Sequence, residues 1–202
     1  MSIARTYAAR PGPRGREIRF AALAIFLACL SAGLWYARSL HLGLNVTGSM
    51  PTGFYRMLPL DRPIVRDDMV VVCAPKDAAA LGAERGYMPA GDCPHRTAPL
   101  LKFAAAVAGD VVTLTQSAVA VNGHRLPDSA TAAIDSRHRP LPALARGTYR
   151  LKPGQVWLWT PYAHGYDSRY YGPVTIASVR ALAQLYLPIA DEAFFQKWVW
   201  RS

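Results

Sequence analysis

The sequence predicts a mainly antiparallel β domain that follows a single N-terminal transmembrane helix. Residues 20–37 form a stretch of eighteen residues without a charge, which is long enough to cross a bilayer. Beyond this stretch, short runs rich in β-branched residues outnumber helical patterns. With 202 residues and 51% apolar composition, the chain is large enough for this anchor and one globular domain.

The charges around the apolar segment predict its orientation. Five arginines precede it and Trp35-Tyr36 ends it, so we expect residues 1–19 in the cytoplasm, residues 20–37 in the membrane and residues 38–202 on the far side. A cleaved signal peptide and a buried helix of a soluble protein are the alternatives. The cluster accounts for much of the net charge of +10, so nucleic acid is not an expected partner. The arginines are Arg5, Arg10, Arg14, Arg16 and Arg19.

Four segments beyond the anchor predict strands, and two long segments predict surface insertions. Both are long for simple turns, and the first predicts one helical turn over residues 78–85. The aromatic tail, residues 192–200, is expected either to pack on the domain or to lie at the membrane surface. The strands are expected at residues 69–73, 111–115, 118–121 (before an Asn-Gly hairpin turn) and 155–159, and the insertions at residues 74–99 and 127–147.

Three cysteines are present, and Cys29 lies inside the apolar segment, where it acts as a small apolar residue. Cys73 and Cys93 lie beyond it. In an oxidising compartment they pair, closing a loop of about twenty residues and stabilising the fold by about 3 kcal/mol; two unpaired thiols are the alternative. The five histidines are isolated from one another and from the cysteines, so the sequence predicts no metal site and no cofactor.

Three short segments together suggest a serine nucleophile with a lysine base. They are Thr47 to Gly53, which contains Ser49; Leu100-Leu101-Lys102; and the segment that begins with Asp167. A serine hydroxyl is a poor nucleophile without an adjacent base, and lysine can be that base only as a neutral amine. Taken singly, they are typical of a turn serine, an edge-strand lysine and a solvated loop.

In order and spacing these segments resemble the membrane-bound Ser-Lys signal peptidases (peptidase family S26), and most closely their conjugative-transfer, TraF-like branch. The resemblance extends from Thr47 to about Val174 and implies a β domain of the signal-peptidase and LexA type. Further matching segments are Gly109 to Val112, the Asn122-Gly123 turn, Cys73, Arg85-Gly86-Tyr87 and Gly91-Asp92-Cys93.

The resemblance implies roles for individual residues. Ser49 matches the nucleophile, Lys102 the general base and Asp167 the acidic residue of the third motif, while the Ser49 N–H and the Thr47 hydroxyl match the oxyanion hole. The pKa of Lys102 must then fall from about 10.4 to about 7 or 8, and its apolar flanks predict that burial lowers it. For Asp167, pairing with Arg169 or capping a turn is the alternative.

Two positions depart from the family pattern. Signal peptidases often carry a serine two residues before the third-motif aspartate, where it helps to hold the lysine, but this chain has Gly165. The residue after the lysine is usually basic in the family and is Phe103 here. With that positive charge missing, we expect burial to supply more of the pKa shift of Lys102.

These observations predict a serine endopeptidase anchored in the bacterial inner membrane, with its catalytic domain in the periplasm. Its partners would be the lipid bilayer and a membrane-inserted precursor cut after small residues. The conjugative branch implies the pilin of a DNA-transfer apparatus as that precursor, and some relatives join the pilin ends into a circle. The alternatives are a general type I signal peptidase and a non-catalytic, anchored scaffold of the transfer machinery.

Overall fold

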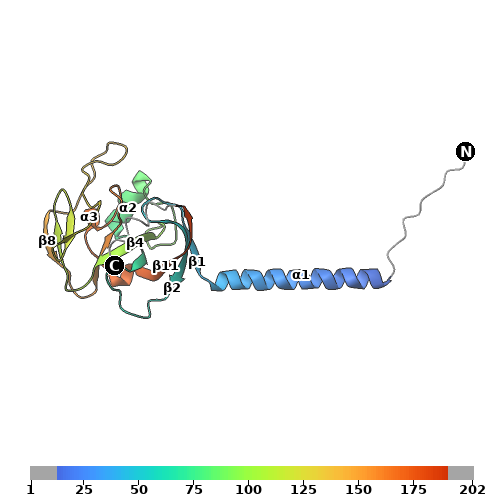
Figure 1. Ribbon diagram of the computed structural model, residues 1–202. Helices are drawn as coiled ribbons and strands as arrows, with labels where there is room; N and C mark the ends of the chain where they lie inside the picture. The colour runs from blue at the N-terminus through green and yellow to red at the C-terminus, as the bar shows by residue number, and fades with distance from the viewer. Residues whose placement is uncertain (1–12, 191–202) are drawn as a thin grey trace, which may run out of the picture. The chain divides into compact units, whose positions relative to one another are not determined.

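A computed structural model of the chain describes residues 13–190. They fall into two compact units, one reaching to His41 and the other beginning at Leu42 (Figure 1). The first unit consists of α1 (Pro13–Ser39), and the second is a β-rich domain. The predicted fold class, mainly antiparallel β with one N-terminal apolar helix, is confirmed.

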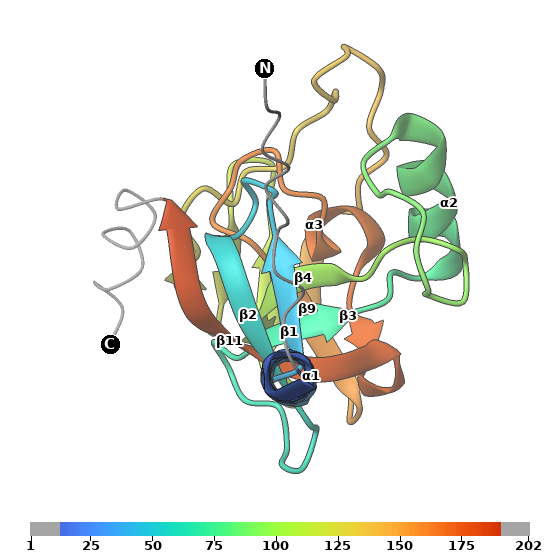
Figure 2. The same cartoon turned by 90° about the vertical axis from the view of Figure 1, so that its right-hand side faces the viewer.

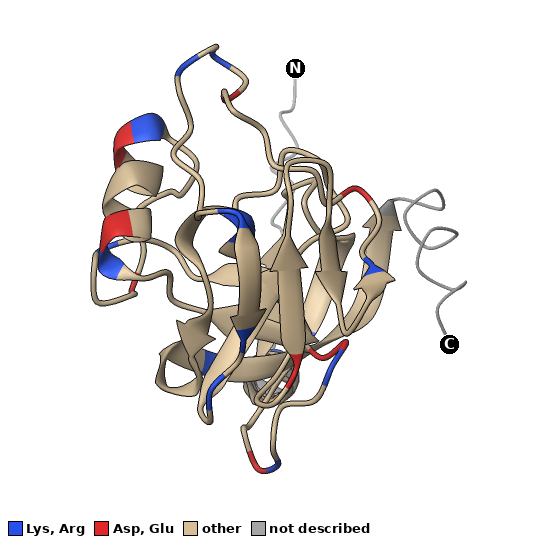
Figure 3. Cartoon of the chain, turned by 90° about the vertical axis from the view of Figure 1, so that its left-hand side faces the viewer, with Lys and Arg blue, Asp and Glu red and all other residues tan. Residues whose placement is uncertain are grey.

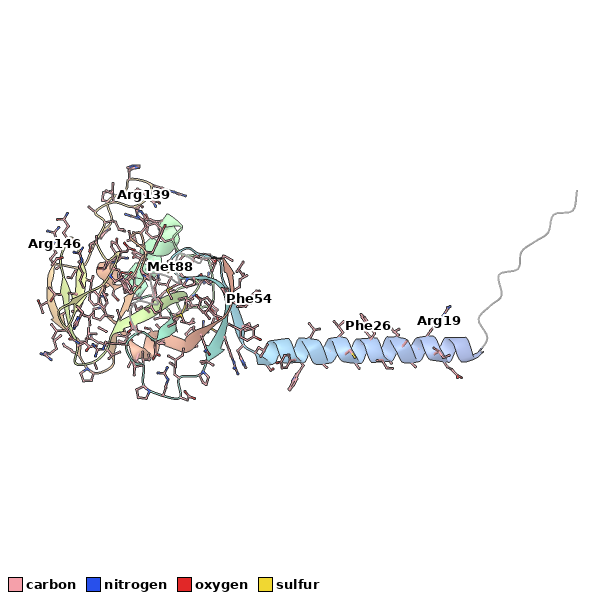
Figure 4. The ribbon with its side chains drawn as sticks, viewed as in Figure 1. Arg19, Phe26, Phe54, Met88, Arg139 and Arg146 are labelled. Atoms are coloured by element: carbon pink, nitrogen blue, oxygen red, sulfur yellow. A yellow bond between two sulfur atoms is a disulfide. The ribbon has the colours of Figure 1, made fainter. Side chains whose placement is uncertain are left out.

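Within the described residues, one helix is long and apolar enough to cross a membrane, at Glu17–Tyr36 inside α1. The 27 residues of α1 span about 40 Å, more than the roughly 30 Å of a bilayer core. Its side chains, such as Arg19 and Phe26, project outward along its length (Figure 4). The predictions for Arg5, Arg10 and the aromatic tail at 192–200 lie outside the described residues.

The β domain contains a seven-stranded antiparallel sheet (Figure 2). The predicted strands at 69–73 and 155–159 are both present in it, and a long strand, β11 (Val179–Ala190), pairs with both β2 (Thr52–Leu58) and β3 (Met69–Val72). In order across the sheet the strands are β1 (Leu42–Asn45), β2 (Thr52–Leu58), β11 (Val179–Ala190), β3 (Met69–Val72), β4 (Leu100–Ala106), β9 (Gln155–Trp159) and β10 (Val174–Thr175).

A second, four-stranded sheet confirms the other two predicted strands and the hairpin turn. Asn122 and Gly123 both have positive φ, 49° and 85°, which is the backbone conformation that an Asn-Gly hairpin turn requires. All its strand pairs are antiparallel. In order the strands are β7 (His124–Arg125), β6 (Val119–Val121), β5 (Val111–Leu114) and β8 (Gly147–Arg150).

The central strand β4 is buried on both faces. Phe103 packs in an apolar cluster that joins the two sheets, together with Trp157 and Trp159 of β9. Ala104 and Val70 belong to the cluster on the opposite face. A strand covered on both sides tolerates a charged side chain only at an energetic cost, and β4 carries one in its middle.

The two insertions carry most of the remaining structure. The first contains α2 (Lys76–Arg85), which is longer than the predicted single turn and ends at Gly86 in the left-handed conformation, φ 75°. The residues of α2 that face the domain are small, whereas its ends carry acidic and basic side chains (Figure 3). The short α3 (Ser168–Tyr171) and a 3₁₀ turn (Ile176–Ser178) follow β9.

Candidate active site

Lys102 lies near the middle of β4, between β3 and β9. Its partner on β3 is Val70, and its neighbours on the same face, Leu100 and Ala104, pack in the apolar cluster there. The side chain is 3% exposed, as the apolar flanks indicated. An edge-strand lysine is excluded because β4 lies inside the sheet.

This environment keeps a larger share of the Lys102 amine neutral near pH 7 than an exposed lysine would have. Burial lowers the pKa of Lys102 from 10.5 to about 8; the negative charge of Asp167 opposes the change, and the positive charge of Arg169 adds to it. With a pKa of about 8, about one amine in ten is neutral at pH 7, against fewer than about one in a thousand for an ordinary lysine.

Ser49 lies in the turn between β1 and β2, and Asn45 fixes the backbone of this turn. The Asn45 Nδ2 donates to the carbonyl oxygens of Thr47 at 3.1 Å, Met50 at 3.0 Å and Pro51 at 3.0 Å. Met50 is buried in the core that joins the two sheets, which anchors the end of the turn next to Ser49. The serine is therefore held by a hydrogen-bonded frame on a rigid strand pair.

Sequence reasoning missed Asn45, although asparagine is a residue whose side chain commonly bonds turn backbone. Its Oδ1 accepts hydrogen bonds from the Thr47 hydroxyl at 2.7 Å and from the Thr47 N–H at 3.2 Å. The hydroxyl proposed for the oxyanion hole is thus bonded to Asn45 in this structure. Its catalytic role stays a prediction.

Ser49 and Lys102 both line a cavity of about 610 Å³. The turn between β1 and β2 lines it on one side, and Tyr87, Met88 and Ile134 of the two insertions line another. The two side chains form no hydrogen bond with each other here. Such bonds are often long before substrate binds, so this geometry is compatible with a Ser-Lys pair.

Asp167 forms a fully buried ion pair with Arg169. The guanidinium donates from Nε to Oδ1 at 2.8 Å and from Nη2 to Oδ2 at 2.9 Å, and neither side chain is exposed. Oδ1 also accepts the backbone N–H of Arg169, which caps α3. Asp167 thus both pairs with Arg169 and caps a helix, the two alternatives to a catalytic role. Its negative charge also acts on Lys102, whose pKa it raises.

Arg169 connects this pair to two loops. Its remaining N–H groups donate to five backbone carbonyl oxygens, which lie in residues 128–130 and 162–165. Buried carbonyl groups need donors, so one guanidinium satisfies much of the local backbone. The carbonyl oxygens belong to Asp128, Ala130, Tyr162, Ala163 and Gly165.

The insertion side of the cavity is held by a second carboxylate, Asp135. It accepts hydrogen bonds from the Tyr87 hydroxyl and from Arg139 Nε, the latter at 2.7 Å, and Arg85 lies 3.7 Å away. Burial raises the pKa of Asp135, but these hydrogen bonds and those from the backbone outweigh it, so its pKa lies below the usual range. Figure 4 marks Arg139 and Met88 in this region.

A disulfide joins Cys73 and Cys93, as predicted. It closes the first insertion at its base, because Cys73 directly follows β3 and Cys93 follows the segment that carries Tyr87 and Met88. Both cysteines are buried. The described residues contain no cluster of His, Cys, Asp and Glu that could hold a metal ion.

Comparison with known proteins identifies the family. The family model described as signal peptidase, peptidase S26, matches residues 15–187. The chain belongs to this family. Members of S26 are serine peptidases, so the family implies that activity for this chain.

Named relatives of this S26 member are conjugation proteins. It is 40% identical over 148 residues to a probable conjugal transfer protein TraF of Sinorhizobium fredii, covering 73% of this chain and 77% of that protein. It is 32% identical over 166 residues to a plasmid transfer protein TraF of Escherichia coli, covering 81% and 92%. A signal peptidase I structure from Enterococcus faecalis is more distant, with 18% identity, a TM-score of 0.34 and coverage of 60% of this chain and 97% of that one.

The two departures from the family pattern have physical explanations here. Phe103 points into the core between the sheets, and burial is the largest cause of the lowered Lys102 pKa, as predicted; the positive charge that adds to it comes from Arg169. A Cβ atom at Gly165 would overlap the hydroxyl oxygen of Thr160 and press on Arg169 Nη2 at 3.0 Å. A side chain at residue 165 would therefore require the Thr160 hydroxyl to move.

Proposed function

We propose that this S26 member is a membrane-anchored endopeptidase in which Ser49 is the nucleophile and Lys102 the general base. The observation that supports this most strongly is a buried lysine with a pKa of about 8 in the same cavity as the serine of the Gly48-Ser49-Met50-Pro51 motif. A structural lysine has no need of a lowered pKa, whereas a general base works best with a pKa near the working pH.

The proposed reaction uses one proton shuttle. The neutral Lys102 amine takes the Ser49 proton as Oγ attacks the peptide carbonyl carbon, and the oxyanion is stabilised by the Ser49 N–H and the Thr47 hydroxyl. The resulting ammonium then protonates the leaving amine as the C–N bond breaks. Water, activated by Lys102, hydrolyses the ester. Asp167 holds Arg169 and the loops beside the cavity, and it touches no reacting atom in this mechanism.

The proposed location is the bacterial inner membrane, with the N-terminus in the cytoplasm and the β domain in the periplasm. Arg14, Arg16 and Arg19 lie at the start of α1, which fits the positive-inside rule. The Cys73–Cys93 disulfide supports an oxidising compartment for the β domain.

The proposed substrate is a membrane-inserted precursor, the pilin of a conjugative transfer system. The TraF names of the relatives support this choice. If the substrate's own N-terminal amine replaces water in the attack on the ester, a peptide bond closes the chain into a circle. The same serine ester thus allows a linear or a cyclic product.

The test is the intact mass of the pilin precursor in membranes that contain the wild-type protein, Ser49→Ala or Lys102→Ala. We expect only the wild type to shorten the precursor, and a further loss of one water from the linear product marks cyclisation. Ser117→Ala and Lys152→Ala, in exposed loops of the β domain, are matched controls and should cleave normally.

The same experiment separates the alternatives. If Ser49→Ala and Lys102→Ala cleave as well as the wild type, the dyad is wrong, and normal pilus assembly with Ser49→Ala then favours a scaffold. Rescue of cells that lack their own leader peptidase would favour a general signal peptidase. Cleavage restricted to the pilin supports the proposal.

A further inference from the structure

We propose that Thr160 is the residue that positions the Lys102 amine, through a hydrogen bond between the Thr160 hydroxyl and the lysine Nζ. This inference rests on the proposed function, because it concerns how the proposed base is oriented. The hydroxyl oxygen would accept a hydrogen bond from the lysine amine while its O–H donates to Asp167 Oδ2, so that hydrogen bonds connect Lys102 through Thr160 to the buried ion pair.

Strand register places Thr160 beside Lys102. In the antiparallel pair of β4 and β9, Phe103 lies opposite Trp159 and Ala104 opposite Leu158. Thr160 directly follows the end of β9, so the next position in this register is opposite Lys102 and on the same face of the sheet. Thr160 has no exposed surface, and Lys102 has almost none. The two polar side chains therefore share one buried location between apolar neighbours.

The hydroxyl of Thr160 has hydrogen-bonding capacity to spare. Its Oγ1 donates to Asp167 Oδ2 at 3.4 Å, a long bond, and the Thr160 N–H donates to the same oxygen at 3.2 Å. A hydroxyl also has two acceptor lone pairs, and no donor to Oγ1 is present among the hydrogen bonds of residues 13–190. Because the strand register puts Thr160 opposite Lys102, this buried acceptor can receive an N–H of the amine when the lysine side chain turns toward it.

Gly165 supplies the space for this hydroxyl. A Cβ atom at residue 165 would occupy the place of Thr160 Oγ1, so a side chain there and the Thr160 hydroxyl exclude each other. Gly165 is itself fixed, because its carbonyl oxygen accepts from Arg169 Nη2 at 2.9 Å. The absence of a side chain at Gly165 therefore leaves the space that the Thr160 hydroxyl, at the end of β9, occupies.

The charged groups that act on Lys102 are Asp167 and Arg169, and they act in opposite directions. A hydroxyl that accepts a hydrogen bond from the ammonium stabilises the charged form, and its removal should lower the pKa of Lys102 further. Its loss should also free the amine to turn away from Ser49. These two effects distinguish a positioning contact from a merely structural one.

The first test measures the Lys102 pKa without catalysis, in the full-length Ser49→Ala protein in detergent micelles. The chain has four lysines, so ¹³C-lysine NMR can resolve the titration of Lys102. We expect Thr160→Val to lower the Lys102 pKa by about half a unit or more and Thr160→Ser to leave it unchanged. Thr113→Val, on β5, is the matched control and should have no effect. An unchanged pKa in Thr160→Val overturns the proposal.

The second test is kinetic and uses the active protein. Thr160→Val should lower the plateau of kcat by about 10- to 100-fold with little change in KM, and shift the acid limb of the pH profile to lower pH, while Thr160→Ser keeps both. A fall in thermal stability with an unchanged kcat plateau overturns the proposal. If Ser49→Ala also cleaves, the proposed function has failed, and the NMR result still decides whether Thr160 contacts Lys102.

Discussion

Two carboxylate–arginine clusters border the candidate active site, and they use the same chemistry in different surroundings. Asp167 and Arg169 are completely buried, and Arg169 also satisfies carbonyl groups of two loops. In the other cluster the carboxylate of Asp135 is 4% exposed, but its partners Arg85 and Arg139 are 15% and 33% exposed. Water can replace a lost partner only in the second cluster, so the first should control folding and the second the shape of the cavity wall.

The largest effect is expected for Arg169→Met, which leaves the Asp167 carboxylate buried without its partner. Breaking a buried ion pair on one side costs about 3 to 5 kcal/mol, and several buried carbonyl groups lose their donor as well. Urea unfolding of the full-length protein in micelles, followed by tryptophan fluorescence, measures this loss. Arg139→Met is the matched control from the other cluster. Equal destabilisation by the two substitutions would contradict the comparison.

Lys102 is a third buried charge in this region, but within residues 13–190 it has no ion-pair partner. Its pKa falls from 10.5 to about 8 on folding, so at neutral pH the charged form destabilises the fold by about 3 kcal/mol. We expect Lys102→Met to abolish cleavage and to raise the free energy of unfolding by a similar amount.

The sign of this effect makes it testable by pH. Between pH 8 and 10.5 the unfolded chain binds the proton that the folded chain has lost, so wild-type stability rises with pH relative to Lys102→Met. The gap between the two proteins should be largest below pH 8 and should close above 10.5. If the difference in unfolding free energy between the wild type and Lys102→Met does not change with pH, the Lys102 ammonium is paired with an opposite charge in the folded chain. Wild-type kcat/KM should rise through a pH of about 8.

The sequence predicted those parts of the fold that depend on local patterns. Runs such as Met69 to Val72 and the Asn122-Gly123 turn carry their own β signal. The strand that holds the lysine, Leu100–Ala106, contains three alanines and has no such signal. It is a strand because β3 and β9 pair with its two edges, which only the folded chain brings together.

The candidate site was predicted to a similar extent. The Cys73–Cys93 disulfide and the burial of Lys102 are confirmed, whereas the catalytic roles of Ser49 and Lys102, which rest on motif and spacing, stay predictions. Asn45 and Thr160 were not found, because a lone polar residue near a strand end has no distinctive pattern. The ion pair and the helix cap of Asp167 became visible only with the position of Arg169, and its catalytic role stays a prediction.

The disulfide should matter less than the buried ion pair but more than the Asp135 cluster. Cys73→Ala/Cys93→Ala removes a cross-link over 20 residues, for which the chain-entropy argument gives about 3 kcal/mol as an upper value. Because the loop it closes carries Tyr87 and Met88, we also expect KM for the precursor to rise. Urea unfolding and steady-state kinetics measure the two effects. Cys29→Ala, on α1, is the control and should change neither.

The smallest effect on stability is expected for Asp135→Asn. The amide keeps the shape of the carboxylate and can still accept from Tyr87 or Arg139, and the two arginines are partly open to solvent. The cavity wall should loosen, so KM should rise a few-fold while kcat stays unchanged, because neither Ser49 nor Lys102 contacts this cluster through a hydrogen bond.

The pH dependence gives a sharper form of this prediction. The pKa of Asp135 lies below its usual range, so its contribution is complete above about pH 4 and is lost only as the pH falls through the lowered pKa. Asp135→Asn should therefore change KM by the same factor at every pH from 5 to 9. The acid limb of the pH–activity profile, which Lys102 sets, should not move. A shifted limb would mean that the two clusters act on the base together, and the division between folding and cavity shape would be wrong.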